Sequence, residues 1–285
     1  MYTARLSGYV IIYLNLQAPD DLPFFQETAI RQALMMGLDR QAIIDEALNG
    51  QGVVARGPIH PWSWAYNPDV SLPGYNPDQA ARLLDEAGWR DTNGDGIRDR
   101  DGQPLAFTLL SSDAPERVAV AEAVSRQWAS IGVEARVEAT AAGLADRLNR
   151  RDFQAALAEV LLAGDPDPYP FWHLSQAKEG QNFAGWTNDE ASLLLEEARR
   201  VTNRGKRNDA YFEFQRIFAE EIPSIILYYP VYTFGVSREV HGVQVAPMTT
   251  PGDRFRSLPN WYMLTRRVIF SEAPFPEAST PTPAK

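Results

Sequence analysis

Two carboxylates, Asp165 and Asp167, alternate with prolines at residues 161–172, which read LLAGDPDPYPFW. The prolines cannot continue a helix interior or a sheet ladder, and Gly164 allows backbone conformations that other residues avoid. The pattern predicts a stiff loop that holds both carboxylates close to the aromatic residues that follow them. A fixed carboxylate beside aromatic rings suits a cationic or amine-bearing ligand, through a charge-assisted hydrogen bond and a cation–π contact.

Two other roles stay open for the same pair of carboxylates. Asp side chains often accept hydrogen bonds at the start of a helix, and a helix is expected here at residues 169–174. Two carboxyl groups at a defined separation also equip a hydrolase, although alternate residues of an Asp-Pro-Asp loop usually point apart. The sequence contains no serine-hydrolase elbow, phosphate-binding loop, zinc-protease motif or dinucleotide-binding fingerprint.

The loop must be positioned by the strand that precedes it. Residues 153–160 (FQAALAEV) alternate and then run apolar, which predicts a buried strand. Ligands of open α/β sheets bind outside the carboxyl ends of the strands, which is where this loop lies. The local pattern is therefore compatible with a binding site and equally with a proline-rich turn whose Asp residues cap the following helix.

The remaining pattern predicts an α/β fold. Strands are expected at 9–16, 105–110 and 133–139, with a long amphipathic helix at 115–131 between the last two. A strand–helix–strand unit of this length predicts parallel pairing. Asp39 and Asn76 are placed to cap helices, and 224–236 is expected to form two short strands broken at Pro230.

A second group of acidic residues, at 91–102, follows the helix that Asn76 is expected to cap. It matches a calcium-binding loop at positions one, three, five, six and nine, with Gly96 at position six, the carbonyl of Ile97 at position seven and Asp101 just before position twelve. Gly102 stands at position twelve, where the template has Glu. The sequence thus predicts a possible structural calcium site, or a polar turn that links a helix to a strand. The side chains at template positions are Asp91, Asn93, Asp95 and Asp99, and Asp101 is the residue before position twelve.

One histidine, His60, lies in a stretch at 52–67 that is dense in Gly, Pro and Trp and has no helical period. We expect this stretch to be an ordered, packed loop. The imidazole is open to two roles, as a ligand group or as a structural hydrogen-bonding group.

Composition excludes several classes of function. The chain has 285 residues, a net charge of −10 and no cysteine. The negative charge argues against nucleic acid as a partner, because phosphate binding needs a basic surface. The absence of cysteine excludes disulfides, thiolate zinc sites and a cysteine nucleophile.

Several motifs, in order along the chain, resemble the substrate-binding proteins of bacterial peptide-type ABC importers, which include oligopeptide-, dipeptide- and nickel-binding members. The resemblance runs from residue 9 to about residue 262. Its motifs are Tyr13-Leu14-Asn15, Ile30-Arg31-Gln32-Ala33-Leu34, Leu38-Asp39-Arg40, Gly57-Pro58-Ile59-His60-Pro61, Tyr66-Asn67-Pro68 and Gly180 to Trp186.

The resemblance implies a periplasmic-binding-protein-like (type II) fold, a mixed sheet flanked by helices, in the carboxyl-terminal half of a two-lobed protein. Residues 1–236 would form the ligand-binding lobe, 237–268 would return toward an amino-terminal lobe, and 269–285 would be a disordered tail. A signal peptide and any lipid-anchor cysteine would lie upstream. The implied function is extracytoplasmic peptide binding and delivery to a membrane permease, by a monomer that is not an enzyme and requires no cofactor.

The resemblance also assigns roles within the site. Asp165 would hold the α-amino group of the ligand, with Asp167 beside it. Asn182, Phe183 and Trp186, in a polar and aromatic segment, would form part of the wall. Dipeptide binders place an Arg after the strand matching 105–110, whereas this chain has Ser111-Ser112-Asp113. That departure favours a longer peptide or another amine-bearing solute; the carboxylate hydrolase and a calcium-stabilised interaction module remain the alternatives.

Overall fold

The computed structural model describes residues 1–17, 23–162 and 164–265. The strands in these ranges are β1 Tyr2–Arg5, β2 Gly8–Leu14, β3 Gly52–Val54, β4 Asp99–Arg100, β5 Gln103–Pro104, β6 Ala106–Ser112, β7 Glu134–Thr140, β8 Ala155–Leu161, β9 Ser224–Phe234, β10 Val240–His241 and β11 Tyr262–Met263. The α-helices are α1 Thr28–Met36, α2 Arg40–Leu48, α3 Pro77–Glu86, α4 Pro115–Ala129, α5 Leu144–Arg150, α6 Tyr169–Trp172, α7 Asp189–Arg200 and α8 Arg204–Glu221.

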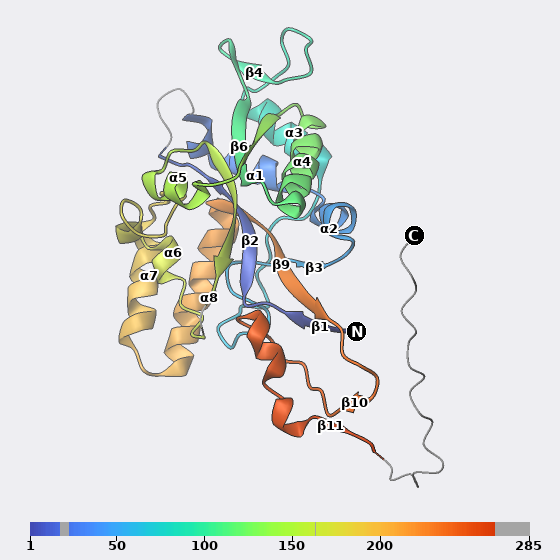
Figure 1. The fold of residues 1–285 in the computed structure, drawn as a ribbon. Helices are drawn as coiled ribbons and strands as arrows, with labels where there is room; N and C mark the ends of the chain where they lie inside the picture. The colour runs from blue at the N-terminus through green and yellow to red at the C-terminus, as the bar shows by residue number, and fades with distance from the viewer. Residues whose placement is uncertain (18–22, 163, 266–285) are drawn as a thin grey trace, which may run out of the picture.

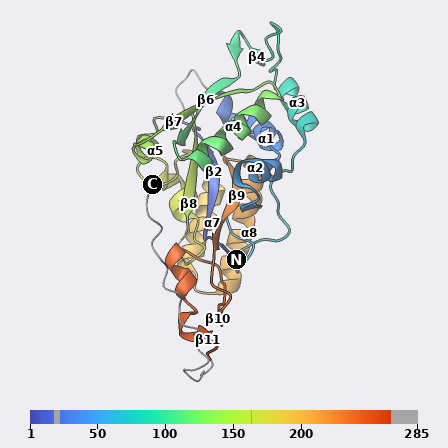
Figure 2. The same cartoon turned by 45° about the vertical axis from the view of Figure 1, so that its right-hand side comes forward.

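A mixed sheet forms the centre of the fold. Within the described ranges it has seven strands in the order β1-β9-β2-β8-β6-β7, with β3 paired to β9. Helices α2 and α4 lie on one side of it and α7 and α8 on the other (Figures 1 and 2). All seven residues of β2 are buried, as expected for a central strand covered on both faces. The predicted α/β class is confirmed.

The strand–helix–strand unit at the middle of the chain pairs as predicted. Helix α4 joins β6 to β7, and these strands run parallel with Ala106 opposite Glu134. Strand β8 is parallel to β6 and antiparallel to β2. Since β6, β7 and β8 run in the same direction, the chain that follows β8 leaves the sheet at its carboxyl edge, where the acidic loop was expected.

Both predicted helix caps are present. The Asp39 side chain accepts a hydrogen bond from the backbone N–H of Ala42 at the start of α2. The Asn76 side chain accepts one from Gln79 at the start of α3, where Pro77 takes the first helical position. Proline is suited to that position because its missing N–H would have no partner inside the helix.

The prediction of two short strands broken at Pro230 was wrong. Residues 224–234 form one strand, β9, which changes partner near the proline. Strand β2 pairs with 224–228 and the unpredicted strand β1 pairs with 231–234. The missing N–H of Pro230 thus falls where the neighbouring ladder is interrupted, and its carbonyl still accepts a hydrogen bond from Leu6.

An aromatic cluster fixes α6 against the sheet and α8. The ring of Trp172 meets Phe218 edge to face at 4.8 Å and is 6.4 Å from the ring of Tyr13 on β2. Edge-to-face aromatic pairs are favoured over flat stacking and add to the free energy of burial. The loop at 164–168 is therefore tied to packed elements at both of its ends.

Residues 237–265 extend away from the sheet and carry the short β10–β11 pair (Figure 1). They join the sheet region through Met248, whose N–H donates to the Arg5 carbonyl at 2.8 Å. Tyr262, Met263 and Leu264 are exposed. The predicted tail at 269–285 lies outside the described residues. Over the described part of the chain, no helix has both the length and the apolar character needed to cross a bilayer.

Candidate ligand-binding pocket

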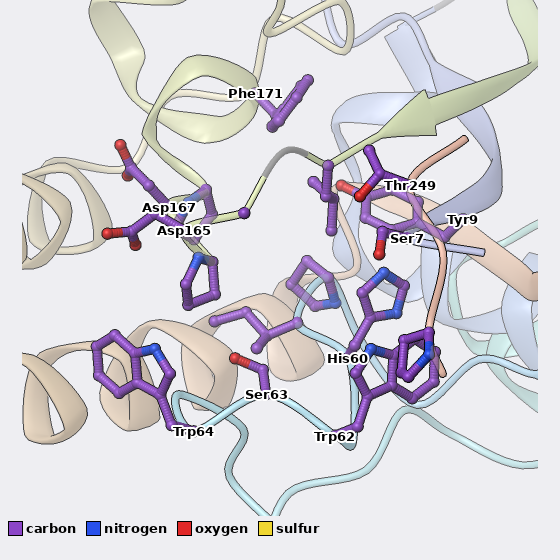
Figure 3. A pocket seen from close by; sticks show the side chains of 17 residues that line it. Ser7, Tyr9, His60, Trp62, Ser63, Trp64, Asp165, Asp167, Phe171 and Thr249 are labelled. Atoms are coloured by element: carbon purple, nitrogen blue, oxygen red, sulfur yellow. The ribbon is translucent and has the colours of Figure 1, made fainter. Parts of the chain in front are cut away.

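A cavity of about 260 Å³ lies beside the acidic loop (Figure 3). Four segments line it: Ser7 and Tyr9 around the start of β2, residues of the loop at 58–64, Leu162 with 164–168 and Phe171, and two residues at 247 and 249. Most of its wall is aromatic rings, prolines and aliphatic side chains. An apolar pocket with a few polar groups is the usual form of a small-ligand site.

The described part of the acidic loop has a positive φ at its glycine. Strand β8 ends at Leu161, and Gly164 has a φ of +44°, a left-handed conformation that glycine adopts without the steric cost of a side chain. Pro166 and Pro168 lie between this glycine and the start of α6. Figure 3 shows Asp165 and Asp167 projecting on the side of the pocket opposite His60 and Trp62.

Asp165 forms an ion pair with Arg207 of α8. Nη2 of Arg207 lies 2.9 and 3.1 Å from the two carboxylate oxygens. The same arginine bonds the hydroxyl of Tyr211 at 3.1 Å and lies 5.0 Å from the ring of Trp64. The Asp165 side chain is 55% exposed, so its carboxylate is paired and still reachable from the solvent.

Asp167 has a different partner and a structural contact as well. It pairs with Arg199 of α7 at 2.7 Å and accepts a hydrogen bond from the N–H of Tyr169, the first residue of α6. The Arg199 guanidinium lies 3.6 Å from the centre of the Tyr169 ring. Asp167 thus has the helix-start role that the sequence left open. Because separate arginines on separate helices hold the two carboxylates, the geometry favours fixed charges over a shared acid–base pair.

Of the three residues expected to supply the wall, Asn182 and Trp186 are buried and Phe183 is half-buried. Asn182 is fully buried, and its amide bonds the carbonyls of His173 and Trp186 and the N–H of Trp186. Phe183 meets Tyr13 edge to face, and the Trp186 indole donates to Glu221 at 2.6 Å. None of Asn182, Phe183 and Trp186 is among the described residues that line the pocket. Their side chains hold their own loop against the sheet and α8.

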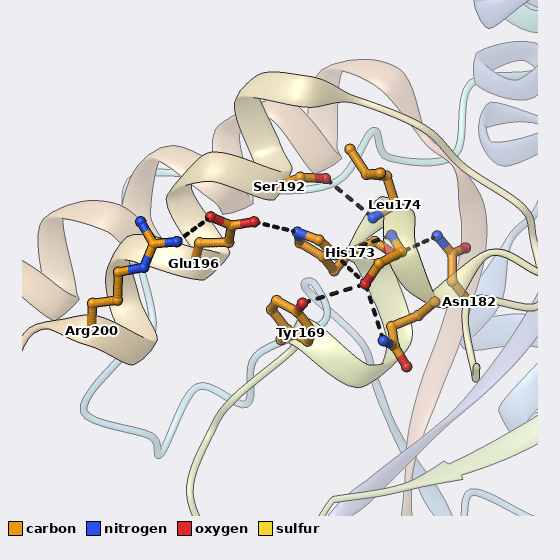
Figure 4. A network of polar contacts seen from close by, with 9 residues as sticks. Tyr169, His173, Leu174, Asn182, Ser192, Glu196 and Arg200 are labelled. Carbon is orange, nitrogen blue, oxygen red and sulfur yellow. Dashed lines mark hydrogen bonds and ion pairs between the residues drawn. The ribbon is translucent and has the colours of Figure 1, made fainter. Parts of the chain in front are cut away.

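A polar network unforeseen from the sequence ties α6 to α7 (Figure 4). His173 stacks on Tyr169 at 4.0 Å, and its Nε2 lies 3.3 Å from Glu196 of α7. Its Nδ1 bonds the hydroxyl of Ser175, and Ser192 accepts a hydrogen bond from the backbone of Leu174. The network fixes the helix that follows the acidic loop, and it joins residues too far apart in sequence for a motif to show.

The calcium-like loop uses its side chains on its own backbone. Asp91 accepts hydrogen bonds from the N–H groups of Gly94 and Gly96, and Asp95 accepts one from Ile97. Asn93 bonds Asp95 through both its side-chain amide and its carbonyl oxygen, and Asp101 takes a left-handed conformation in the β4–β5 turn.

Asp99 of β4 bonds the hydroxyl and the N–H of Thr92, which lowers the pKa of its carboxyl. Across the described residues, no group of three or more His, Asp or Glu side chains is arranged to hold a metal ion. These hydrogen bonds within the loop are typical of a polar turn that links a helix to a strand, which was the alternative interpretation. Calcium binding stays a prediction.

His60 forms one wall of the cavity and is 6% exposed. Its ring stacks on Trp62 at 4.2 Å and meets Tyr229 at 4.6 Å. Among the described residues, neither of its ring nitrogens has a hydrogen-bond partner. Burial lowers the pKa of the imidazole to about 4. The sequence marked the 52–67 stretch as a packed loop but did not predict that it would face the acidic loop.

The chain matches the family model of bacterial extracellular solute-binding proteins, family 5 (middle region), over residues 1–183. It therefore belongs to this family. It is 34% identical over 242 residues to the oligopeptide-binding protein AppA of Bacillus subtilis (strain 168), covering 83% of this chain and 44% of that protein. It is 27% identical over 248 residues to a dipeptide-binding protein of Escherichia coli (strain K12), covering 85% and 43%.

Solved structures agree with the sequence comparisons. The structure of AppA from Bacillus subtilis in complex with a nonapeptide is similar, with a TM-score of 0.79 and 32% identity, over 93% of this chain and 52% of that one. NikZ from Campylobacter jejuni in complex with Ni(L-His) has a TM-score of 0.74 and 25% identity, over 91% and 52%. The predicted family and the type II binding-protein fold are confirmed. The chain spans less than half the length of the two curated relatives.

Proposed function

We propose that this chain forms one side of the ligand cleft of an extracytoplasmic peptide-binding protein that serves an ABC importer. The family match and the likeness to AppA support a binding role. The observation that carries the proposal is the half-exposed carboxylate of Asp165 at the edge of an aromatic pocket. A binding protein of this kind captures its ligand and releases it unchanged to a membrane permease, so we expect no turnover of bound peptide.

Asp165 is the proposed anchor for the ligand's amino terminus. A carboxylate has about four lone-pair sites, and Arg207 approaches through a single nitrogen placed between the two oxygens. Outer lone pairs are therefore left for an ammonium group. A hydrogen bond to a charged group contributes about 1.5–3 kcal/mol. The anchor would thus fix one end of the peptide, and side-chain contacts would supply the rest of the affinity.

Replacing Asp165 with Asn is expected to weaken peptide binding by about 10- to 100-fold, because it removes the charge that attracts the ammonium. Isothermal titration calorimetry of the complete two-lobed protein measures the effect. Acetylating the peptide's amino terminus should weaken binding to the unmodified protein by a similar factor. The two losses should not add in the combined experiment, since both remove the same contact.

Asp167→Asn is the matched control, because Asp167 is in the same loop and is held by Arg199 and the start of α6. It should reduce affinity only slightly. Equal losses from both substitutions, or full additivity of Asp165→Asn with acetylation, would show that Asp165 does not bind the amine.

Arg207 competes with the ligand for Asp165. Replacing Arg207 with Met keeps much of the side-chain bulk beside Trp64 and removes the charge, so affinity for peptides with a free amino terminus should rise about fivefold. The size of the effect follows from the modest strength of solvent-exposed ion pairs. Titrating peptides with free and with acetylated amino termini distinguishes a gain in amine binding from a general gain in peptide affinity. A fall in affinity would mean that Arg207 positions Asp165 and does not compete for it.

The second wall of the cleft is proposed to come from a further lobe, against which residues 237–265 would pack. Tyr262, Met263 and Leu264 are exposed on this segment, and exposed apolar side chains that cluster commonly mark a contact surface. In the two-lobed protein this surface would be covered within one molecule, consistent with a monomer that closes on its ligand.

A further inference from the structure

The cavity beside the acidic loop has an apolar wall that the fold leaves partly uncovered. The side chains of Trp62, Trp64 and Phe171 line it, and each of these residues is half-buried, so part of its surface stays open to a ligand. Prolines at 58, 166, 168 and 247 line it as well. Protein interiors contain few voids larger than a water molecule, so an open apolar cavity of this size is suited to a guest.

Neighbouring aromatic residues hold the two tryptophans in place. The Trp62 ring stacks on His60 at 4.2 Å and meets Tyr229 edge to face at 5.5 Å. The ring of Trp64 lies 6.0 Å from that of Tyr211 on α8. A wall that is fixed before binding loses little conformational freedom when a ligand arrives, which favours affinity.

The size of the cavity restricts the guest to one large side chain. Its volume is about 260 Å³. An apolar cavity of about 150 Å³ already holds a benzene molecule, whereas pockets for drug-sized ligands begin at about 300 Å³. A leucine or phenylalanine side chain therefore fits, and its burial stabilises the complex in proportion to the apolar area removed from water.

The charges around the cavity favour an uncharged guest. The Arg5 guanidinium lies 5.2 Å from the centre of the Trp62 ring, and that of Arg204 lies 4.9 Å from the centre of the Trp64 ring. A cationic side chain in the cavity would meet these two positive groups. An anionic one would lie beside the two loop carboxylates, which line the same cavity. A polar side chain of either kind would also lose hydration against apolar walls.

We propose that this cavity is the subsite for a large apolar side chain on the first residue of a bound peptide. The inference rests on the proposed peptide-binding function and adds a specificity to it. Asp165, the proposed anchor for the amino terminus, itself lines the cavity. The amino group and the first side chain are attached to the same carbon atom, so anchoring one brings the other to the cavity. In an extended peptide the second side chain points to the opposite side, and the third lies about 7 Å further along.

The test is calorimetry of the complete two-lobed protein with peptides that differ only in having Ala, Leu or Gln as the first residue. The Leu peptide should bind about 10- to 50-fold more tightly than the Ala peptide, because three more carbon atoms are buried. The Gln side chain is of similar size but polar, so its peptide should bind at least about fivefold less tightly than the Leu peptide. Moving Leu to the second or third position should remove most of the gain.

Ser63→Leu is expected to remove the preference by filling the cavity. Ser63 lines the cavity and is half-buried, and Figure 3 shows it between Trp62 and Trp64. A leucine there occupies the space of the guest, so the Leu peptide should lose most of its advantage while the Ala peptide keeps its affinity within about threefold. Ser71→Leu is the matched control, because Ser71 is exposed and is not among the described residues that line the cavity. It should keep the preference.

The possible outcomes separate this inference from the function on which it rests. Peptide binding with equal affinity for Leu and Ala at the first residue overturns the subsite and leaves peptide binding standing. Equal gains from Leu and Gln overturn its apolar character, and a larger gain at another position overturns its assignment to the first residue. A preference that persists in Ser63→Leu overturns the role of this cavity. If the folded protein binds none of the peptides, the proposed function fails and the subsite falls with it. The wild-type peptide series decides the matter even if Ser63→Leu does not fold.

Discussion

Replacing Asn182 with Ala is expected to lower the free energy of unfolding by about 3 kcal/mol, because buried groups would lose their partners. The Asn182 side chain is fully buried and bonds two backbone carbonyls and one N–H. Alanine removes this contact from the carbonyl and the N–H of Trp186 in the interior, whereas the His173 carbonyl keeps a hydrogen bond from the N–H of Gln176. Each such loss costs about 1–3 kcal/mol when the group stays buried, although the losses are not strictly additive.

Chemical denaturation followed by tryptophan fluorescence measures this change, and the same variant can be titrated with peptide below its transition. We expect peptide affinity to be preserved within about twofold, since Asn182 acts through the packing of its own loop. Asn149→Ala, at an exposed position of α5, is the matched control and should change stability by less than about 0.5 kcal/mol. A stable Asn182→Ala variant that has lost peptide binding would contradict this expectation and support the ligand-wall role predicted from the sequence.

Asn182 illustrates which parts of the site the sequence could predict. The acidic loop was predictable because Gly164 and the alternating prolines restrict the backbone locally, whatever surrounds them. The strand before the loop was predictable from the alternation of its apolar residues. A segment rich in Asn, Phe and Trp carries no such signal, because the same residues build a ligand wall or a bonded interior loop equally well.

The partners of the two carboxylates were unpredictable for a different reason. Arg207 and Arg199 lie on two helices that follow the acidic loop in the sequence, and only the packing of α7 and α8 brings them to it. His60, Trp62 and Trp64 lie far before the acidic loop in the sequence, and only the tertiary fold brings them to the same cavity. Contacts of this kind depend on tertiary arrangement, which local propensity and periodicity do not encode.

The calcium-like loop shows the limit of a motif that lacks one ligand. Asp91 and Asp95 have the spacing of the template, yet hydrogen bonds to backbone N–H groups satisfy these side chains equally well. Short polar side chains commonly bond their own backbone in turns. Spacing alone therefore does not separate an ion site from a turn, and calcium binding at this loop stays a prediction.

Stability is expected to fall as the pH drops from about 6.5 to about 4, and His60 should carry a separable part of that loss. The imidazole has an ordinary pKa near 6.5 when the chain is unfolded, and burial lowers it to about 4 in the fold. Between these values the unfolded chain binds a proton that the folded chain does not, so acid favours unfolding. The contribution is complete above pH 6.5 and lost near pH 4, and the pKa difference corresponds to about 3 kcal/mol at most.

His60→Phe isolates this contribution, because phenylalanine keeps a ring against Trp62 and Tyr229 and cannot bind a proton. The variant should unfold with a shallower dependence on pH between 4 and 6.5, measured as denaturation midpoints along a pH series and expressed as a difference from the unmodified protein. Carboxyl groups such as Asp99, whose pKa is lowered by hydrogen bonds from Thr92, also make stability depend on pH. Because both proteins contain these groups, their effect is removed when the two are subtracted. His241→Phe should leave the dependence unchanged. Identical pH profiles for His60→Phe and the unmodified protein would mean that the imidazole is hydrated and protonates freely in the fold.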